Sequence, residues 1–126
     1  MLPGYRLPLY DEWAVACRAG TTTERYCGDS DELLSSYAWY FVTSNDRPGP
    51  VASLLPNDFG LFDMLGNAAE WCHNDRTDKQ STDATVRDTL VGGHYQSNPS
   101  VVATFRNQII PSRYIISGFR VVKTLE

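Results

Sequence analysis

Two carboxylates, Asp63 and Glu70, stand inside an apolar, glycine-punctuated stretch of the sequence, DFGLFDMLGNAAEW (residues 58–71). A hard cation such as Ca2+ takes about six to eight oxygen ligands, from carboxylates and from backbone carbonyls of a loop that folds around the ion. Gly66 permits the left-handed turn that would swing carbonyl oxygens inward, and the small Ala68 leaves room for the loop to close. The stretch could therefore hold calcium.

A structural role is the alternative for the same two side chains. Asp63 would then cap a turn, and Glu70 would pair with a distant arginine such as Arg106 or Arg120. The stretch does not follow the EF-hand pattern, so spacing alone favours this structural alternative.

Other chemistries have weaker support. Cys72 and His73 are adjacent, and no second Cys/His pair completes a zinc site. A triad of Ser97, His94 and an aspartate lacks a nucleophile elbow. The pair Gly92-Gly93 lacks the rest of a phosphate-binding loop. His94 titrates in a range useful for acid–base chemistry, but a surface histidine is the simpler interpretation.

Composition limits the class of protein. The 126 residues suit one domain, and 42% hydrophobic with 21% charged residues is typical of a soluble globular chain. The net charge of −4 gives no basic face for nucleic acid. No apolar run approaches the roughly 20 residues that span a bilayer. The opening MLPGYRLP is unlike a signal peptide, which leaves the cytoplasm as the default compartment.

The three cysteines are Cys17, Cys27 and Cys72. Their odd number and the absence of CxxC spacing argue against a disulfide framework and a zinc ribbon. Free thiols in a reducing compartment are expected.

One helix is expected over residues 7–20, where Leu9, Trp13 and Cys17 recur on one face and Gly20 can end the helix. Its start is weakly specified, because no Ser, Thr, Asp or Asn stands at the N-cap. Residues 21–63 are rich in turns yet also in aromatic rings. This combination predicts ordered irregular structure pinned by buried rings.

Short strands account for most of the remaining regular structure. One is possible at 37–42, and three are expected at 89–96, 101–107 and 118–124, after a polar solvated loop at 73–88. In the last strand Phe119 and Val121 alternate with Arg120 and Val122, the period of a half-buried strand. One helix with short strands and long loops indicates the α+β class.

The order of motifs resembles one family. GYRLPLYDEWAVACRAGTTT, YAWY, LPNDFGLFDMLGNAAEW, LVGGHYQ, FRN and SGFRVV follow one another as in the formylglycine-generating enzyme, or sulfatase-modifying-factor, family. The resemblance covers nearly the whole chain. It implies a C-type-lectin-like α+β fold that is stabilised by Ca2+.

The resemblance also assigns the two carboxylates. It implies that Ca2+ is held by the Asp63 side chain, the Gly66 and Ala68 carbonyls and the Glu70 carboxylate. Trp71 would then be a core residue.

The chain departs from the family at its catalytic centre. The family's oxidation of a substrate cysteine to formylglycine uses copper held by two enzyme thiolates, which suit Cu(I). The matching positions here are Ser97 and Val102, and no cysteine follows Cys72. We therefore expect no copper and no copper-dependent oxidase activity.

The chain also starts close to a helix that lies well inside the usual family domain. Residues 1–126 are therefore expected to form one domain that lacks its N-terminal part. A missing half or a second copy would cover the core, so self-association is expected.

Two functions follow from the resemblance. The first is a non-catalytic module that binds a protein or peptide through residues 94–116, which are rich in recognition residue types. The candidate contacts are His94, Tyr95, Ser97, Asn98 and Arg106. The second is a formylglycine-generating oxidase, or a relative with reassigned oxidative chemistry.

Overall fold

A computed structural model describes residues 4–73, 88–102 and 116–125. The helices are α1 (Tyr10–Arg18) and a 3-10 turn, η1 (Leu34–Ser36). The strands are β1 (Tyr5–Arg6), β2 (Ala69–His73), β3 (Asp88–Val91), β4 (Ser117–Gly118) and β5 (Val122–Lys123). The expected α+β class with little regular structure is confirmed. None of the described helices has the length and apolar character needed to cross a bilayer.

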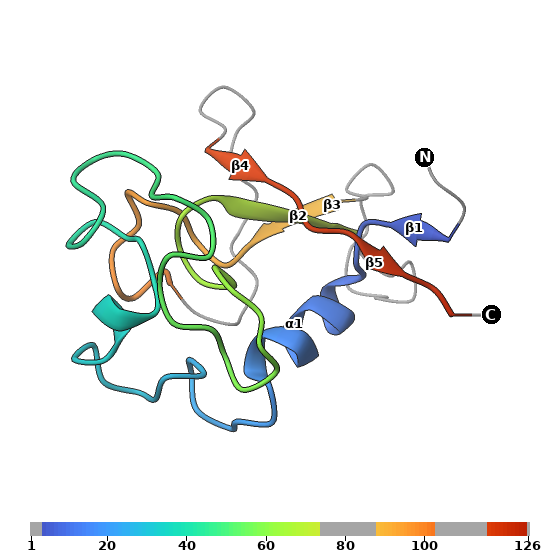
Figure 1. The fold of residues 1–126 in the computed structure, drawn as a ribbon, viewed down its shortest axis with the longest axis horizontal. Coiled ribbons are helices and arrows are strands. Elements are labelled where there is room, and N and C mark those ends of the chain that lie inside the picture. Colours follow the sequence, from blue (N-terminus) through green and yellow to red (C-terminus); the bar gives the residue numbers. More distant parts are fainter. Residues whose placement is uncertain (1–3, 74–87, 103–115, 126) are drawn as a thin grey trace, which may run out of the picture.

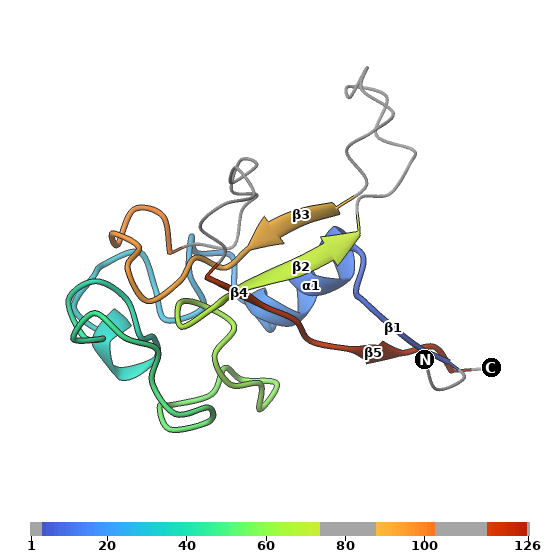
Figure 2. The same cartoon turned by 90° about the horizontal axis from the view of Figure 1, so that it is seen from above.

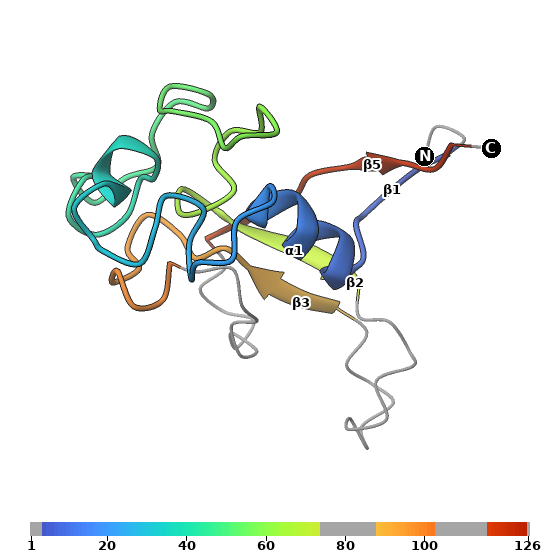
Figure 3. The same ribbon diagram turned by 90° about the horizontal axis from the view of Figure 1, so that it is seen from below.

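The strands form two small sheets. In the first, β2 lies between β3 and β4, antiparallel to β3 and parallel to β4. In the second, β1 pairs with β5, which brings the two ends of the described chain together (Figure 1). Helix α1 lies against the β2–β3 sheet, and the long loops gather at the far end of the molecule (Figures 2 and 3).

Helix α1 buries the face that its periodicity predicts. Trp13 and Cys17 are fully buried. The Glu12 carboxylate accepts a hydrogen bond from the Leu9 backbone N–H at 2.8 Å, which caps the start that the sequence left weak. Ala19 adopts a left-handed conformation (φ 49°) and ends the helix, as expected near Gly20.

Buried and half-buried aromatic rings pin the loops between α1 and β2, as expected, although Phe41 is exposed. Tyr40 is buried, and the rings of Tyr26 and Tyr37 meet edge to face at 5.6 Å. The possible strand at 37–42 does not form. Trp39 makes an isolated bridge to Gly66 instead, because the chain turns immediately after it.

The C-terminal prediction of one strand over 118–124 is wrong. Strand β4 pairs with β2 and β5 pairs with β1, so the chain changes sheets between them. Phe119 and Val121 are 72% and 51% exposed there. These two side chains therefore face solvent while Val122 is half-buried, which reverses the alternation expected of this strand.

The strand expected at 89–96 ends at Val91. Gly92 and Gly93 follow it with φ of 88° and 73°, conformations that interrupt a strand. The strand expected at 101–107 and the polar loop at 73–88 lie almost entirely outside the described residues.

Candidate functional site

A groove of about 460 Å3 opens beside β2. Asp63, Ala68 and Glu70 line it, and these are three of the four expected calcium ligands. Gly66 is buried and is not among the lining residues. The other lining residues are Val51, Ala52, Gly60, Leu61, Phe62, Asn67, Gly118, Phe119 and Arg120.

The Glu70 carboxylate is buried and accepts three hydrogen bonds from two residues. Arg120 donates from Nε to Oε2 at 3.0 Å and from Nη2 to Oε1 at 2.8 Å. Trp13 donates from its indole Nε1 to Oε2 at 2.8 Å. The alternative in which Glu70 pairs with Arg120 is therefore realised. The other candidate partner, Arg106, lies outside the described residues.

Left-handed backbone shapes the turn that carries the first carboxylate. Asp63, Gly66 and Asn67 have φ of 56°, 74° and 63°. A Cβ on Gly66 would lie 2.3 Å from the Trp39 carbonyl oxygen, so only glycine fits there. The prediction of a left-handed turn at Gly66 is confirmed. Asp63 Oδ2 accepts a hydrogen bond from the Ala52 N–H at 2.7 Å, which is the capping role that the structural alternative gave it.

The groove can hold a cation only if backbone carbonyl oxygens supplement its carboxylates. Within the described residues, no three His, Cys, Asp or Glu side chains gather to hold a metal ion. A hard cation would therefore rely on the carboxylates of Asp63 and Glu70 and on backbone carbonyls, which are suitable oxygen donors. It would also have to share Glu70 with Arg120.

A second set of candidates surrounds Gly93. A Cβ on Gly93 would lie 3.3 Å from Val102 Cγ2 and 3.4 Å from Ser97 Oγ. The two positions matched to the family's cysteines are therefore neighbours, and both are buried. Ser97 Oγ accepts a hydrogen bond from the His94 N–H at 2.9 Å, which fixes the turn between them.

The residues expected to contact a ligand differ in their exposure to solvent. Asn98 is exposed, and His94 and Tyr95 are half-buried with their rings edge to face at 6.2 Å. Burial lowers the pKa of His94, and its Nδ1 accepts the Gln96 N–H at 3.2 Å. Arg106 lies outside the described residues. Ser97 is buried, so its hydroxyl positions the turn.

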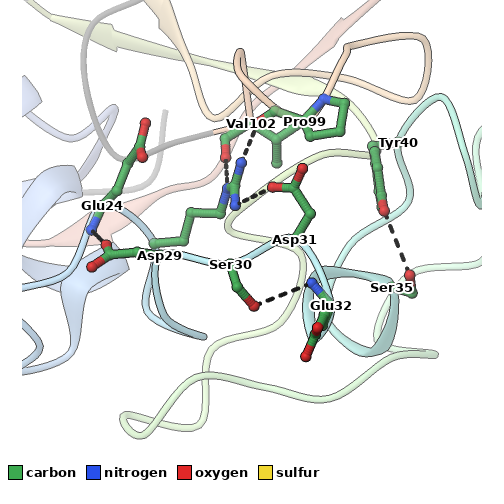
Figure 4. A network of polar contacts seen from close by, with 10 residues as sticks. Glu24, Asp29, Ser30, Asp31, Glu32, Ser35, Tyr40, Pro99 and Val102 are labelled. Atoms are coloured by element: carbon green, nitrogen blue, oxygen red, sulfur yellow. Dashed lines mark hydrogen bonds and ion pairs between the residues drawn. The ribbon is translucent and has the colours of Figure 1, made fainter.

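Arg25 holds the other end of this turn and was not identified from the sequence. Its guanidinium is buried and donates to the Val102 and Pro99 carbonyl oxygens at 2.8 and 2.6 Å, and to Asp31 at 2.8 Å (Figure 4). The sequence around Arg25 carries no local signal for this role, because the two carbonyl oxygens that it binds lie 77 and 74 residues away in the chain.

Trp71 and Cys72, the two residues after Glu70, differ in burial. Trp71 is half-buried and lies outside the core cluster, which corrects its assignment as a core residue. Cys72 is fully buried within the core, because alternate residues of β2 face opposite sides of the sheet. Burial raises the pKa of Cys72 to about 12.

The family model that matches the chain and the similar known proteins are consistent with each other. Residues 2–125 match the model of the sulfatase-modifying factor enzyme 1-like domain. The chain is 32% identical over 131 residues to a formylglycine-generating enzyme of Mycobacterium tuberculosis, covering 82% of this chain and 44% of the relative. It is 26% identical over 111 residues to the chaperone protein LppX of Paenibacillus barcinonensis, covering 75% of this chain and 40% of the relative.

Solved structures share the fold. Treponema denticola variable protein 1 superimposes with a TM-score of 0.80 at 31% identity, over 93% of this chain and 46% of that chain. PvdO from Pseudomonas aeruginosa gives a TM-score of 0.75 at 26% identity, over 96% of this chain and 53% of that chain. The chain thus spans about half the length of these relatives. On the match of residues 2–125, it belongs to the sulfatase-modifying factor enzyme 1-like domain family.

Proposed function

We propose that this chain is a binding module of its family, without the copper-dependent oxidation of cysteine to formylglycine, and that Ca2+ stabilises it. The observation that carries the proposal is the pair Ser97 and Val102. The resemblance matches these positions to the family's thiolates; both side chains lie beside Gly93, and they offer a hydroxyl and two methyl groups. Neither group can hold Cu(I) as a thiolate does.

A surface for a protein or peptide ligand lies next to this pair. The Phe41 backbone N–H donates to the Ser97 carbonyl oxygen at 3.0 Å, so the Phe41 turn is fastened to the turn at Ser97. The side chains of Phe41 and Val42 are 66% and 67% exposed. Together with Tyr95 and Asn98 they give a surface of mixed apolar and polar groups, as recognition surfaces have.

The names of the relatives differ from one another. A formylglycine-generating enzyme, a chaperone protein and a variable protein all share this domain. Because one fold hosts several functions, membership alone does not decide between oxidation and binding. The formylglycine-generating enzymes among the relatives keep the oxidase as the alternative function.

The first experiment separates these two functions. The chain is incubated with copper, oxygen and a sulfatase peptide of the CxPxR type, and aldehyde formation is followed by mass spectrometry. We expect no aldehyde from the wild type. Aldehyde formation by the wild type would refute the non-oxidase proposal.

A paired variant tests whether the two positions correspond to the family's cysteines. Ser97→Cys/Val102→Cys should bind one Cu(I), because two thiolates would then lie beside Gly93. The single variants Ser97→Cys and Val102→Cys are the controls and should bind it much more weakly. Equal affinity in all three would show that the positions are wrongly matched.

The binding surface can be tested with a displayed peptide library. Peptides selected on the wild type should lose affinity for Phe41→Ser by about tenfold or more, as central aromatic contacts usually do. Phe59→Ser is the matched control, because Phe59 is similarly exposed (59%) on a separate turn. Equal losses for the two variants would rule out the Phe41 surface.

The calcium part of the proposal rests on Asp63, Gly66, Ala68 and Glu70. A ligand that binds the native state raises the unfolding midpoint by mass action. We expect the midpoint, measured by near-UV circular dichroism, to rise with millimolar Ca2+ and to fall with a chelator. An Asp63→Asn variant should lose most of this shift, and an unchanged wild-type midpoint would refute the calcium part.

A further inference from the structure

The guanidinium of Arg120 is hydrogen-bonded to the Glu70 carboxylate, which a bound cation would also need as a ligand. Arg120 takes one lone pair on each oxygen of Glu70, and Trp13 takes a second on Oε2. A carboxylate offers about four such acceptor sites. The chain itself therefore uses three of them, which leaves one free on Oε1.

Arg120 is also anchored to the rest of the groove. Its Nη2 donates to the Phe62 carbonyl oxygen at 2.8 Å. Burial alone would lower the pKa of Arg120, but the hydrogen bonds and charge of Glu70, with a smaller effect of Asp63, raise it. The guanidinium is thus held by Glu70 and the Phe62 carbonyl oxygen, in the groove that Asp63 also lines.

Sheet topology explains how a residue so distant in sequence reaches Glu70. Strand β4 runs parallel to β2 and pairs Gly118 with Glu70. The chain then leaves β4, with Phe119 facing outward and Arg120 turned back over the groove. The SGFR segment places a positive charge beside the metal-binding candidate.

We infer that Arg120 is an internal competitor of the cation and sets the calcium affinity of this groove. A divalent ion on Asp63 and Glu70 would lie next to the guanidinium, and like charges in a partly buried site repel each other strongly. With the ion pair formed, Glu70 is satisfied without metal. This inference rests on the calcium part of the proposed function and is independent of the peptide-binding part.

Isothermal titration of the full chain with Ca2+ tests the inference in four variants. Arg120→Gln should bind Ca2+ at least tenfold more tightly than the wild type. Arg120→Lys should give a smaller gain, because an ammonium cannot bind a carboxylate through a planar fork. Glu70→Gln should bind more weakly. The matched control is Arg6→Gln, which removes a bidentate Arg–Glu pair of the same kind at Glu12 and should leave the affinity unchanged.

The outcomes separate the inference from the proposal beneath it. Equal affinity in the wild type and both Arg120 variants would overturn the role of Arg120 and keep the calcium site. Binding by the Arg120 variants alone would support the competition and overturn calcium as a ligand of the native chain. Absence of binding in every variant would overturn both. If Arg120→Gln does not fold, Arg120→Lys decides by the same criteria.

Discussion

The indole N–H of Trp13 donates to Glu70 Oε2 at 2.8 Å, which ties helix α1 to strand β2 across 57 residues. Both residues are buried, and they are 1% and 8% exposed. The same Glu70 carboxylate receives Arg120 from the opposite end of the chain. One carboxylate thus joins the helix, the sheet and the C-terminal segment, so its loss affects all three.

Trp13→Phe removes this donor and keeps an aromatic ring. Hydrogen bonds to charged groups contribute about 1.5–3 kcal/mol, and we expect a loss of stability in that range. The measurement is the free energy of unfolding in denaturant. Trp39→Phe is the control, because its indole N–H donates at 3.1 Å to the uncharged Ser53 hydroxyl in an exposed position and should cost less. Equal losses would contradict a special role for Glu70.

Alanine substitutions at Gly66 and Gly60 distinguish the stability cost of a steric clash from that of backbone strain. Both have positive φ, 74° and 77°, but only at Gly66 does a Cβ meet backbone, 2.3 Å from the Trp39 oxygen. Gly60→Ala should cost about 1–2 kcal/mol, the strain of the left-handed conformation. Gly66→Ala should cost considerably more or prevent folding, as measured by thermal unfolding. Equal effects would mean that the turn can move away from Trp39.

The three cysteines should differ in reactivity. Cys17 and Cys72 are fully buried, and burial raises the pKa of Cys72 to about 12. Cys27 is partly exposed, although burial raises its pKa as well. Because the thiolate is the reactive form, Cys27 should be alkylated first in the native chain, and the other two only on unfolding. Peptide mapping after iodoacetamide treatment would show the order, and early labelling of Cys72 would contradict it.

Acid should weaken the start of α1. The hydrogen bonds from Arg6 lower the pKa of Glu12 from 4.5 to about 2. A carboxylate whose pKa is depressed in the folded state stabilises it fully above the unfolded pKa, and this stabilisation is lost as pH falls through the folded value. We expect the unfolding midpoint to decline between about pH 4.5 and 2. The decline should be smaller in Glu12→Gln, and an identical profile would exclude Glu12 as a cause.

The hydroxyl of Tyr26 is buried and has no hydrogen-bond partner among the residues that the structure describes. A buried polar group without a partner costs free energy relative to its solvated state. Tyr26→Phe should therefore leave the unfolding midpoint unchanged or raise it, because the ring contact with Tyr37 remains. A clear decrease would show that the hydroxyl has a partner.

Several features follow from the sequence because they depend on local patterns. The spacing of Trp13 and Cys17 predicts the buried face of α1, and Gly66 marks a left-handed turn that other residues cannot adopt without strain. The absence of cysteine at positions 97 and 102 is also a property of the sequence, whatever the fold. The order of motifs indicates the family and the α+β class, and both are shown.

Tertiary structure alone decided the partners of the charged residues. Sequence spacing left three possible partners for Glu70, namely a cation, Arg106 and Arg120. The parallel pairing of β4 with β2 brings Arg120 to Glu70. Arg25 is similar, since its partners on the 97–102 turn are distant in the chain. Phe119 faces outward because the chain changes sheets around it. Such contacts depend on strand pairing between distant segments, which the local pattern of residues does not encode.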